Sequence, residues 1–187
     1  TNLIKRLLKE DHEVISIDNY STGKTENHIE GVRYYIKETI CNILIDPPWQ
    51  LIGFKPDVVF HMAAIARIQP SFKNPKEYLE TNYKGTYEVV QYCTELNIPL
   101  IYAGSSSHHS GRFKNPYTFS KDMGEDIIKL YQKHFGLKAS IARFYNVYGP
   151  YQLTEGGYTT LIGRWLKNIK KGLPCEIYGD GSKRRDF

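Results

Sequence analysis

The sequence predicts an α/β protein built on a doubly wound parallel sheet. Short β-rich apolar runs alternate along the chain with amphipathic helical segments of ten or more residues, which is the pattern of strands joined by helical crossovers. Polar or small residues follow several of these runs directly: Asp18, Ala63-Ala64, Ser105-Ser106 and Asn146. In open parallel sheets, ligands bind beyond the carboxyl ends of the strands, so these residues are candidates for a site.

The chain opens with helical periodicity. Leu3, Ile4, Leu7 and Leu8 recur at helical spacing. No capping residue or turn precedes them, so we expect the chain to begin inside a helix. A β-rich run follows over residues 12–18 and ends in an acid.

Proline and glycine residues mark where several of the later strands and helices begin or end. Strands are expected at 57–61, 98–103, 139–145 and 175–178. Helices are expected at 75–96, 117–135 and 159–171, the first opening on a proline and the other two followed by glycine.

Composition is that of an ordinary globular protein. The 187 residues are 41% hydrophobic and 24% charged, with a net charge of +5 spread along the chain. No apolar run approaches the roughly 20 residues of a membrane span, and no signal segment opens the chain. We therefore expect a cytoplasmic protein that binds neither membrane nor nucleic acid. Cys41, Cys93 and Cys175 are widely separated and lack ligand-spaced histidines, so no disulfide framework and no metal site are expected.

Tyr117 and Lys121 are the most informative pair. They lie four positions apart, and on a helix they share one face. An ammonium favours the phenolate form of a neighbouring tyrosine, and a serine hydroxyl at the same place can relay the proton. Such a group can take a proton from an alcohol while hydride leaves its carbon. Alone, the pair could equally be two surface residues of one helix.

Asp18 closes the first expected strand. An acid there typically binds a ribose 2′-hydroxyl and disfavours a 2′-phosphate, which favours NAD over NADP. The glycine-rich phosphate loop would lie about 20 residues earlier, before residue 1. The alternative is that Asp18-Asn19 is only a turn. His61 lies within a strand pattern and is expected to be structural.

Seven segments, taken in order, resemble the extended short-chain dehydrogenase/reductase family, in particular its nucleotide-sugar epimerases such as the UDP-galactose 4-epimerases. They are 18–23 (DNYSTG), 61–64 (HMAA), 81–86 (TNYKGT), 103–107 (AGSSS), 117–121 (YTFSK), 143–150 (RFYNVYGP) and 179–187 (GDGSKRRDF).

The resemblance implies a role for each matching residue. Catalysis is implied for Tyr117 with Lys121 as partner and for Ser106, with Ser107 the neighbour that could be confused with it. NAD binding is implied for Asp18, Asn19, Asn42, Ile43, Ala63, Ala64, Thr81, Tyr117, Lys121 and Tyr145. Contact with a nucleotide-diphosphate sugar is implied for Ser106, Asn146 and Arg185, the arginine gripping the diphosphate.

The resemblance also implies the reaction. Related dehydratases and decarboxylases carry a carboxylate just after the catalytic serine or threonine, whereas here Ser107-His108-His109-Ser110 follows. This favours NAD-dependent epimerisation at sugar carbon 4 through a 4-keto intermediate. The alternatives are a dehydratase, decarboxylase or reductase of the same family, and a non-catalytic NAD-sensing or scaffold protein. His108 and His109 are either a pair of loop residues or include an acid for another step.

Finally, the resemblance implies a Rossmann-like NAD-binding domain at 1–150, without its first strand and glycine loop, and the beginning of a substrate lobe at 151–187. The chain would thus be truncated at both ends and poorly active as it stands. Helices 75–96 and 117–135 correspond to those that form a homodimer in relatives.

Overall fold

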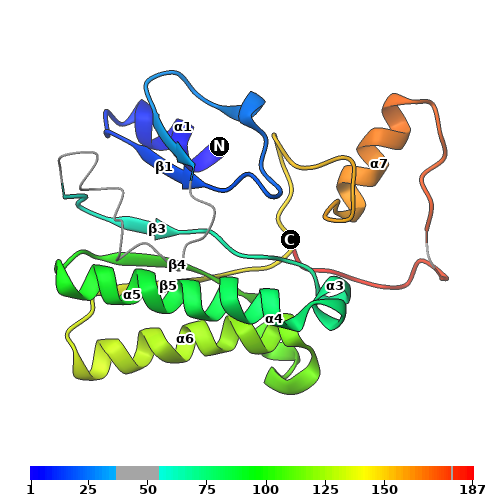
Figure 1. Cartoon of the computed structure of the whole chain (residues 1–187). Coiled ribbons are helices and arrows are strands. Elements are labelled where there is room, and N and C mark those ends of the chain that lie inside the picture. The colour runs from blue at the N-terminus through cyan, green and yellow to red at the C-terminus, as the bar shows by residue number, and fades with distance from the viewer. Residues whose placement is uncertain (37–54, 178) are drawn as a thin grey trace. The chain divides into compact units, whose positions relative to one another are not determined.

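The computed structural model describes residues 1–36, 55–177 and 179–187 (Figure 1). The chain divides into two compact units. We call residues 37–144 the Tyr117 unit, and residues 1–36 with 145–187 the Asp18 unit. Asn42 and Ile43, expected to flank the adenine, lie outside the described residues.

The Tyr117 unit holds a three-stranded parallel sheet. Its strands are β3 (Val59–His61), β4 (Leu100–Ser105) and β5 (Ala139–Phe144), in that spatial order. Parallel neighbours need crossover connections, and helices supply them here. The expected strands at 57–61, 98–103 and 139–145 are confirmed, with ends that differ by up to two residues.

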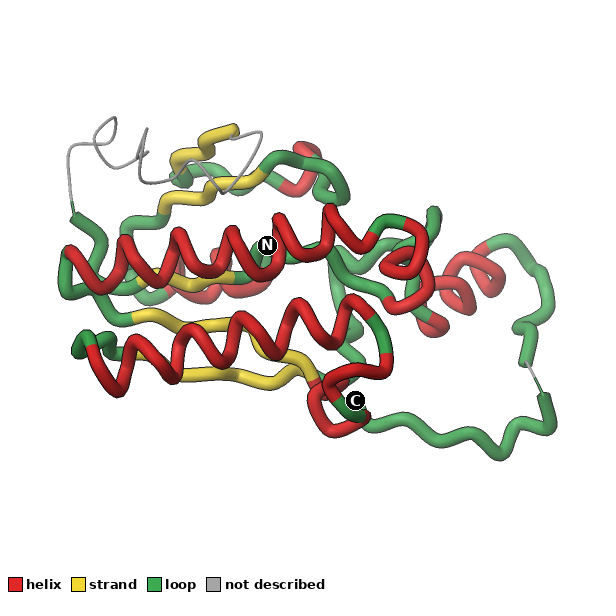
Figure 2. The backbone as a smooth tube through the Cα atoms, turned by 60° about the horizontal axis from the view of Figure 1, so that its bottom comes forward, coloured by secondary structure: helices red, strands yellow, loops and turns green. Residues whose placement is uncertain are grey.

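The helices of this unit carry the chain between the strands. They are α3 (Ile68–Lys73), α4 (Pro75–Tyr78), the π-helical turn η3 (Leu79–Lys84), α5 (Gly85–Glu95), the 3-10 helices η4 (Ser106–Ser110) and η5 (Arg112–Lys114), and α6 (Pro116–His134). Helices α5 and α6 lie side by side against one face of the sheet (Figures 1 and 2).

Two expectations about these helices need correction. The helix expected over 75–96 is not continuously α-helical, because a π-helical turn interrupts it and places the Asn82 side chain against the backbone of Ile65. Helix α3 was not expected. The helix expected over 117–135 is confirmed; it begins with Pro116 at its first position, and Asn115 caps it by accepting the Thr118 N–H at 2.8 Å.

The core of the Tyr117 unit forms where α5 and α6 meet strand β4. Val90, Cys93, Leu100 and Ile128 are fully buried there. Burial of such apolar surface is the main stabilising contribution to the unit. At Gly124 of α6 the helix approaches β4 so closely that a Cβ atom would lie 2.5 Å from the Tyr102 hydroxyl. Only glycine permits this approach.

The Asp18 unit has its own, smaller sheet. Helix α1 (Asn2–Lys9) leads to β1 (Ile15–Asp18), which pairs in parallel with β2 (Arg33–Ile36). A short 3-10 helix, η1 (Thr25–Asn27), lies between the strands. The opening helix and the strand ending at Asp18 are confirmed. Strand β2 was not expected from the sequence.

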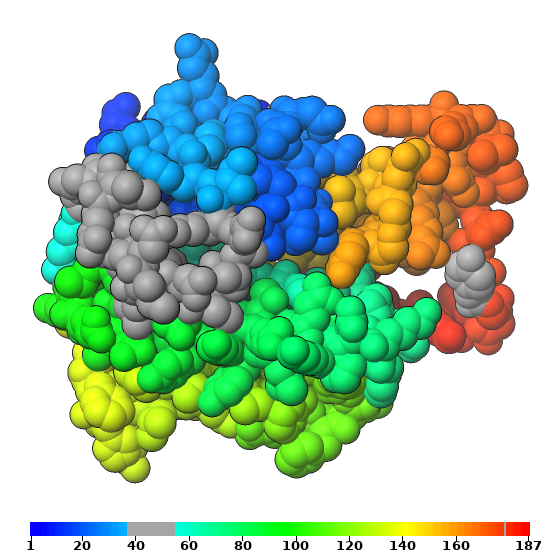
Figure 3. Space-filling view, viewed as in Figure 1, coloured from blue at the N-terminus to red at the C-terminus, as the bar shows by residue number. Residues whose placement is uncertain are grey.

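The C-terminal part of the Asp18 unit contains α7 (Leu161–Lys170), which confirms the expected helix. Its side chains and those after it are mostly exposed (Figure 3). The strand expected over 175–178 is wrong for residues 175–177, and Tyr178 is outside the described residues. Side chains of α7 bind carbonyl groups in and just before this segment: Trp165 Nε1 donates to the carbonyl of Glu176 and Asn168 Nδ2 to that of Pro174, both at 2.9 Å.

These features confirm an α/β, Rossmann-like arrangement of parallel strands and helices. Among the described residues, no helix combines the length and the apolar character needed to cross a membrane.

Candidate active site

The hydroxyl groups of the serine run meet the tyrosine at the end of β4. The Tyr117 phenol donates a hydrogen bond to Ser105 Oγ at 3.2 Å, and Ser105 Oγ lies 2.9 Å from Ser107 Oγ. Ser105 also caps η4 by accepting the Ser107 N–H at 3.2 Å. Ser106, the expected catalytic serine, lies in the same turn, but Ser105 makes the contact with the phenol.

The ring of Tyr117 is held from the side by another tyrosine. Tyr78 is 1% exposed, and its ring contacts that of Tyr117 edge-on at a centroid distance of 6.3 Å. Its hydroxyl donates to the Ala66 carbonyl at 2.8 Å. Tyr78 therefore connects the loop after β3 to the phenol, a role that the sequence did not indicate.

Lys121 lies one helical turn beyond Tyr117 and is 3% exposed. Its Nζ lies 4.2 Å from the centroid of the Tyr102 ring, within range of a cation–π interaction. Burial lowers the pKa of Lys121 to about 7, although the nearby Glu125 carboxylate opposes this shift. Lys121 can therefore gain or lose its proton near neutral pH. The spacing of Tyr117 and Lys121 alone did not reveal this property.

Glu125 is the most deeply buried acid of α6, at 1% exposed. Arg143 of β5 donates to both of its carboxylate oxygens, at 3.0 and 2.6 Å. Gly104 of β4 lies against this pair, and a Cβ atom there would be 3.0 Å from Glu125 Oε1. The bidentate pair joins α6 to β5 and balances the buried charge.

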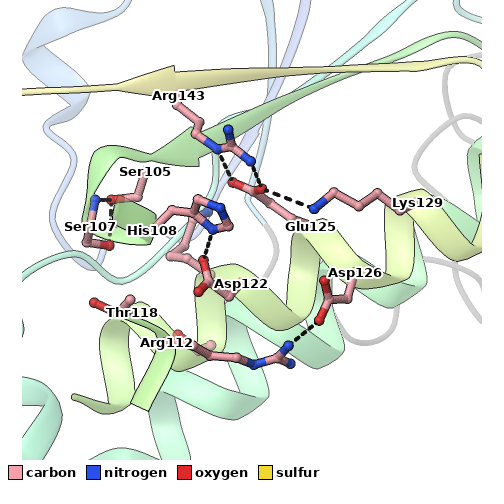
Figure 4. Close-up of polar contacts among 12 residues, drawn as sticks. Ser105, Ser107, His108, Arg112, Thr118, Asp122, Glu125, Asp126, Lys129 and Arg143 are labelled. Atoms are coloured by element: carbon pink, nitrogen blue, oxygen red, sulfur yellow. Dashed lines mark hydrogen bonds and ion pairs between the residues drawn. The ribbon is translucent and has the colours of Figure 1, made fainter. Parts of the chain in front are cut away.

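A second buried acid, Asp122, pairs with a histidine of η4. His108 Nδ1 lies 2.9 Å from Asp122 Oδ1 (Figure 4). Ligand atoms of His108, Asp122 and Glu125 lie within 4.8 Å of one another, a spacing that could suit a metal ion. A cation there would have to compete with Arg143 for Glu125, so we retain the expectation that the site holds no metal.

His61 and Asn82 are buried polar residues near the sheet. His61 Nε2 lies 2.9 Å from Thr86 Oγ1. Burial, followed by the charge of Lys121, lowers the pKa of His61 to about 3, so the imidazole is neutral at physiological pH. This supports the structural role expected for His61.

Asn82 lies in the segment 81–86 that carries the family resemblance, but the sequence analysis gave it no role. Its amide oxygen accepts the Ile65 N–H at 2.7 Å, and its amide nitrogen donates to the Ile65 carbonyl at 2.9 Å and to Ser120 Oγ at 3.0 Å. It thereby fixes the loop that contains the exposed Ala63 and Ala64, which are expected to contact NAD. The available signal was a polar residue among the apolar positions of a helical pattern. Thr81, its neighbour, is half-buried.

In the Asp18 unit, the expected ribose-binding residues are exposed at the end of β1. Asp18 Oδ1 accepts the Tyr20 N–H at 2.8 Å, and Asn19 Oδ1 accepts the Ser21 N–H at 3.0 Å, so both side chains shape the turn. A cavity of about 260 Å³ lies beside them, with Asp18, Gly23 and Tyr34 in its lining.

The expected substrate residues Asn146 and Arg185 are brought together within the Asp18 unit. The backbone and side-chain nitrogens of Asn146 donate to the carbonyl of Asp186 at 3.2 and 2.8 Å. This places Asn146 beside the chain segment that carries Arg185. Asn146, Arg185 and the nearby Tyr145 are all exposed and accessible to a ligand.

Parallel strands with polar groups at their carboxyl ends, followed by a helix that carries Tyr117 and Lys121, are typical of α/β enzymes that use a bound dinucleotide. The sequence profile of the NAD dependent epimerase/dehydratase family matches residues 1–187, and the chain belongs to this family. The family uses NAD to modify nucleotide sugars.

Individual relatives are distant. The chain is 30% identical to an uncharacterized UDP-glucose epimerase of Bacillus subtilis, YtcB, over 100% of the chain and 64% of that protein. It is 27% identical to a UDP-N-acetyl-alpha-D-glucosaminuronate decarboxylase of Bacillus cytotoxicus, over 100% of the chain and 63% of that protein. Its fold matches the UDP-glucose 4-epimerase of Thermotoga maritima, solved with UDP-glucose, with a TM-score of 0.90 at 24% identity, covering 99% of the chain and 64% of that protein. The chain therefore spans less than two thirds of each of these proteins.

Proposed function

We propose that the protein epimerises a nucleotide sugar at carbon 4, in an NAD-dependent reaction that passes through a transient 4-keto sugar. The observation that carries this proposal is the hydrogen bond from the Tyr117 phenol to Ser105 Oγ at 3.2 Å, with Lys121 buried one turn along the same helix.

Tyr117 would act as the base that takes the proton of the sugar 4-hydroxyl. Lys121, in its charged form, stabilises the negative phenolate, and a serine hydroxyl holds the sugar oxygen or relays its proton. Ser106 was expected for this role, and the geometry makes Ser105 a second candidate. On the return step Tyr117 gives the proton back to the 4-oxygen, after the keto sugar has presented its other face.

The exposed residues of the Asp18 unit suit the two ligands. The carboxylate of Asp18 beside a cavity of about 260 Å³ fits a ribose with free hydroxyls, and Asn19 and Tyr145 would add to the NAD contacts. When bound, the nicotinamide accepts and returns the hydride. Arg185, next to the segment held by Asn146, would bind the diphosphate of the sugar nucleotide through charge-assisted hydrogen bonds.

The second candidate is a decarboxylase or dehydratase of the same family, supported by the decarboxylase relative. Against it, no carboxylate follows the serine run at positions 107–110. A non-catalytic NAD-sensing protein is disfavoured by the intact serine, tyrosine and lysine. We also propose, by likeness to relatives, a homodimer formed through α5 and α6.

The test is incubation of the natural protein that carries this chain with UDP-, GDP-, ADP- and dTDP-sugars in the presence of NAD. We expect a pair of 4-epimers to interconvert without net NADH formation. Release of carbon dioxide or water would select the second candidate, whereas NAD binding without any turnover of the panel would contradict an enzymatic role.

A further inference from the structure

The His108–Asp122 pair is the part of the Tyr117 unit that the proposed reaction leaves unused. A plain 4-epimerisation needs one base, because the hydride that leaves carbon 4 is returned to it. Yet a histidine and a buried acid lie hydrogen-bonded at 2.9 Å, and both are close in sequence to candidate catalytic residues. The pair joins η4, which starts directly after Ser105, to α6, where Asp122 directly follows Lys121.

The contact with Asp122 defines which ring nitrogen of His108 carries a proton. The Asp122 side chain is 7% exposed, and its carboxylate can only accept a hydrogen bond, so Nδ1 of His108 carries the proton. In the neutral ring, Nε2 then has a free lone pair and is a base. The His108 side chain is 35% exposed, so a ligand can reach it, whereas Asp122 is covered. This is the usual division between a histidine that transfers a proton and an acid that orients it.

The neighbouring His109 differs in its exposure to solvent. It is exposed on the same turn and contacts His108 through the ring, at a centroid distance of 5.5 Å. Figure 4 shows His108 between the Ser105–Ser107 turn and α6, directed toward Asp122. The structure thus separates two histidines that the sequence left equivalent.

We propose that His108, oriented by Asp122, is a second proton-transfer residue that acts on a carbon-bound hydrogen next to the transient ketone of the sugar. This inference rests on the proposed function, which supplies the ketone by hydride loss to the nicotinamide. Nε2 removes the proton from the carbon adjacent to the carbonyl. The C–H electron pair forms a carbon–carbon double bond, and the carbonyl oxygen takes the negative charge.

Return of the proton from His108 restores the ketone, so the step involves no net oxidation. The added activity is exchange of that hydrogen with solvent and, when the proton returns to the opposite face, inversion at that carbon. The substrate class is therefore a nucleotide sugar with an exchangeable hydrogen at a carbon adjacent to carbon 4.

The first test does not depend on the cofactor or the sugar. We would label the histidines of the natural protein with ¹⁵N and determine the tautomer of His108 by NMR at a pH where its ring is neutral. We expect Nδ1 protonated and Nε2 bare, and Asp122→Asn should shift the tautomer toward protonated Nε2. A wild-type ring protonated on Nε2 overturns the proposal, because that nitrogen could not accept a proton.

The second test is turnover in D₂O of the sugar identified by the panel, followed by mass spectrometry and NMR of the product. We expect deuterium at a carbon next to carbon 4. In His108→Gln the ratio of exchange to 4-epimer formation should fall about a hundredfold. The glutamine side chain can still donate a hydrogen bond to Asp122. The variant therefore separates loss of proton transfer from loss of the contact between η4 and α6. His109→Gln is the matched control and should exchange as the wild type does.

The outcomes distinguish the two proposals. If 4-epimers interconvert without deuterium uptake, or if His108→Gln exchanges at the wild-type ratio, the second proton-transfer role is wrong and the proposed function stands. If no sugar of the panel turns over, the proposed function fails and this inference fails with it, whatever the tautomer of His108.

Discussion

The two units differ in whether the acids of their described ion pairs are buried: the Tyr117 unit buries two of them, whereas in the Asp18 unit all are exposed. In the Tyr117 unit, the side chains of Asp122 and Glu125 are 7% and 1% exposed, and each is paired with a base. In the Asp18 unit, the acids of the described ion pairs, Glu10, Glu13 and Glu155, are 47%, 62% and 66% exposed. The first unit holds these two acids in fixed positions before any ligand arrives, whereas the second presents its paired acids to solvent.

This difference teaches which changes should damage the fold and which should damage binding. Breaking one partner of a buried pair leaves a charge without solvent or counterion, which is strongly destabilising. Exposed pairs contribute little, because water and salt screen them. The chemistry proposed for Tyr117 thus depends on a rigid framework, and that proposed for Asp18 and Arg185 on groups that a ligand must organise.

The largest effect is expected for Tyr117→Phe. Removal of the phenolic oxygen eliminates the proposed base, so kcat should fall by about 10²–10⁴-fold. The ring and its contact with Tyr78 remain, so the free energy of unfolding should change by no more than about 1 kcal/mol. Steady-state kinetics and urea unfolding measure the two quantities, with Tyr87→Phe on α5 as a control. Unchanged turnover would show that Tyr117 is not the base.

Next in size is the loss of stability in Arg143→Gln. This change leaves the buried Glu125 with only the Lys129 ammonium, 3.9 Å away, and should lower the free energy of unfolding by about 3–5 kcal/mol. The matched variant in the other unit is Arg6→Gln, whose pair with Glu10 is exposed and should cost at most about 1 kcal/mol. Urea unfolding of both variants tests the comparison directly. Similar losses in the two would remove the distinction between the units.

A smaller, pH-dependent effect is expected for Lys121→Met. Burial lowers the pKa of Lys121 from 10.5 to about 7, so between these values the unfolded chain binds more protons than the folded one. Wild-type stability should therefore rise as the pH rises from 7 to 10.5. Below pH 7 the buried charge is present in full, and the methionine variant should be more stable than the wild type by an amount that shrinks as the pH rises, while its turnover falls.

Unfolding measured between pH 6 and pH 10 would test this prediction. A stability difference that does not shrink as the pH rises would show that Lys121 is not a strained buried cation. Such a result would mean that the Tyr117 unit holds a buried positive charge at a lower cost in stability than the burial of Lys121 indicates.

The sequence predicted the features that depend on local pattern. Helical spacing placed Tyr117 and Lys121 on one helix, and strand patterns placed Asp18 at the end of one strand and the serine run after another. It did not predict contacts that join distant segments. Which serine meets the phenol depends on where β4 ends, and the expected Ser106 lies one residue beyond that point.

Other features of the site were also beyond local patterns. Asn82 holds a backbone group 17 positions away, and His108 pairs with an acid 14 positions away. No periodicity in the sequence connects such positions. The strand expected near Cys175 was wrong for a related reason, because side chains of α7 bind the carbonyl groups of Glu176 and of the preceding Pro174. The roles of all the expected site residues, Tyr117 and Lys121 included, remain predictions.

The smallest effect should come from the exposed residue Asp18. Asp18→Asn keeps an acceptor for the Tyr20 N–H, so the turn should persist and the free energy of unfolding should change by less than about 0.5 kcal/mol. The loss of charge should weaken NAD binding by about tenfold, because a charged acceptor binds ribose hydroxyls more strongly than a neutral one. Calorimetric titration of NAD into the natural protein and its variant measures this. A large loss of stability with unchanged affinity would mean that Asp18 is only a turn residue, and that the Asp18 unit depends on its polar groups as the Tyr117 unit does.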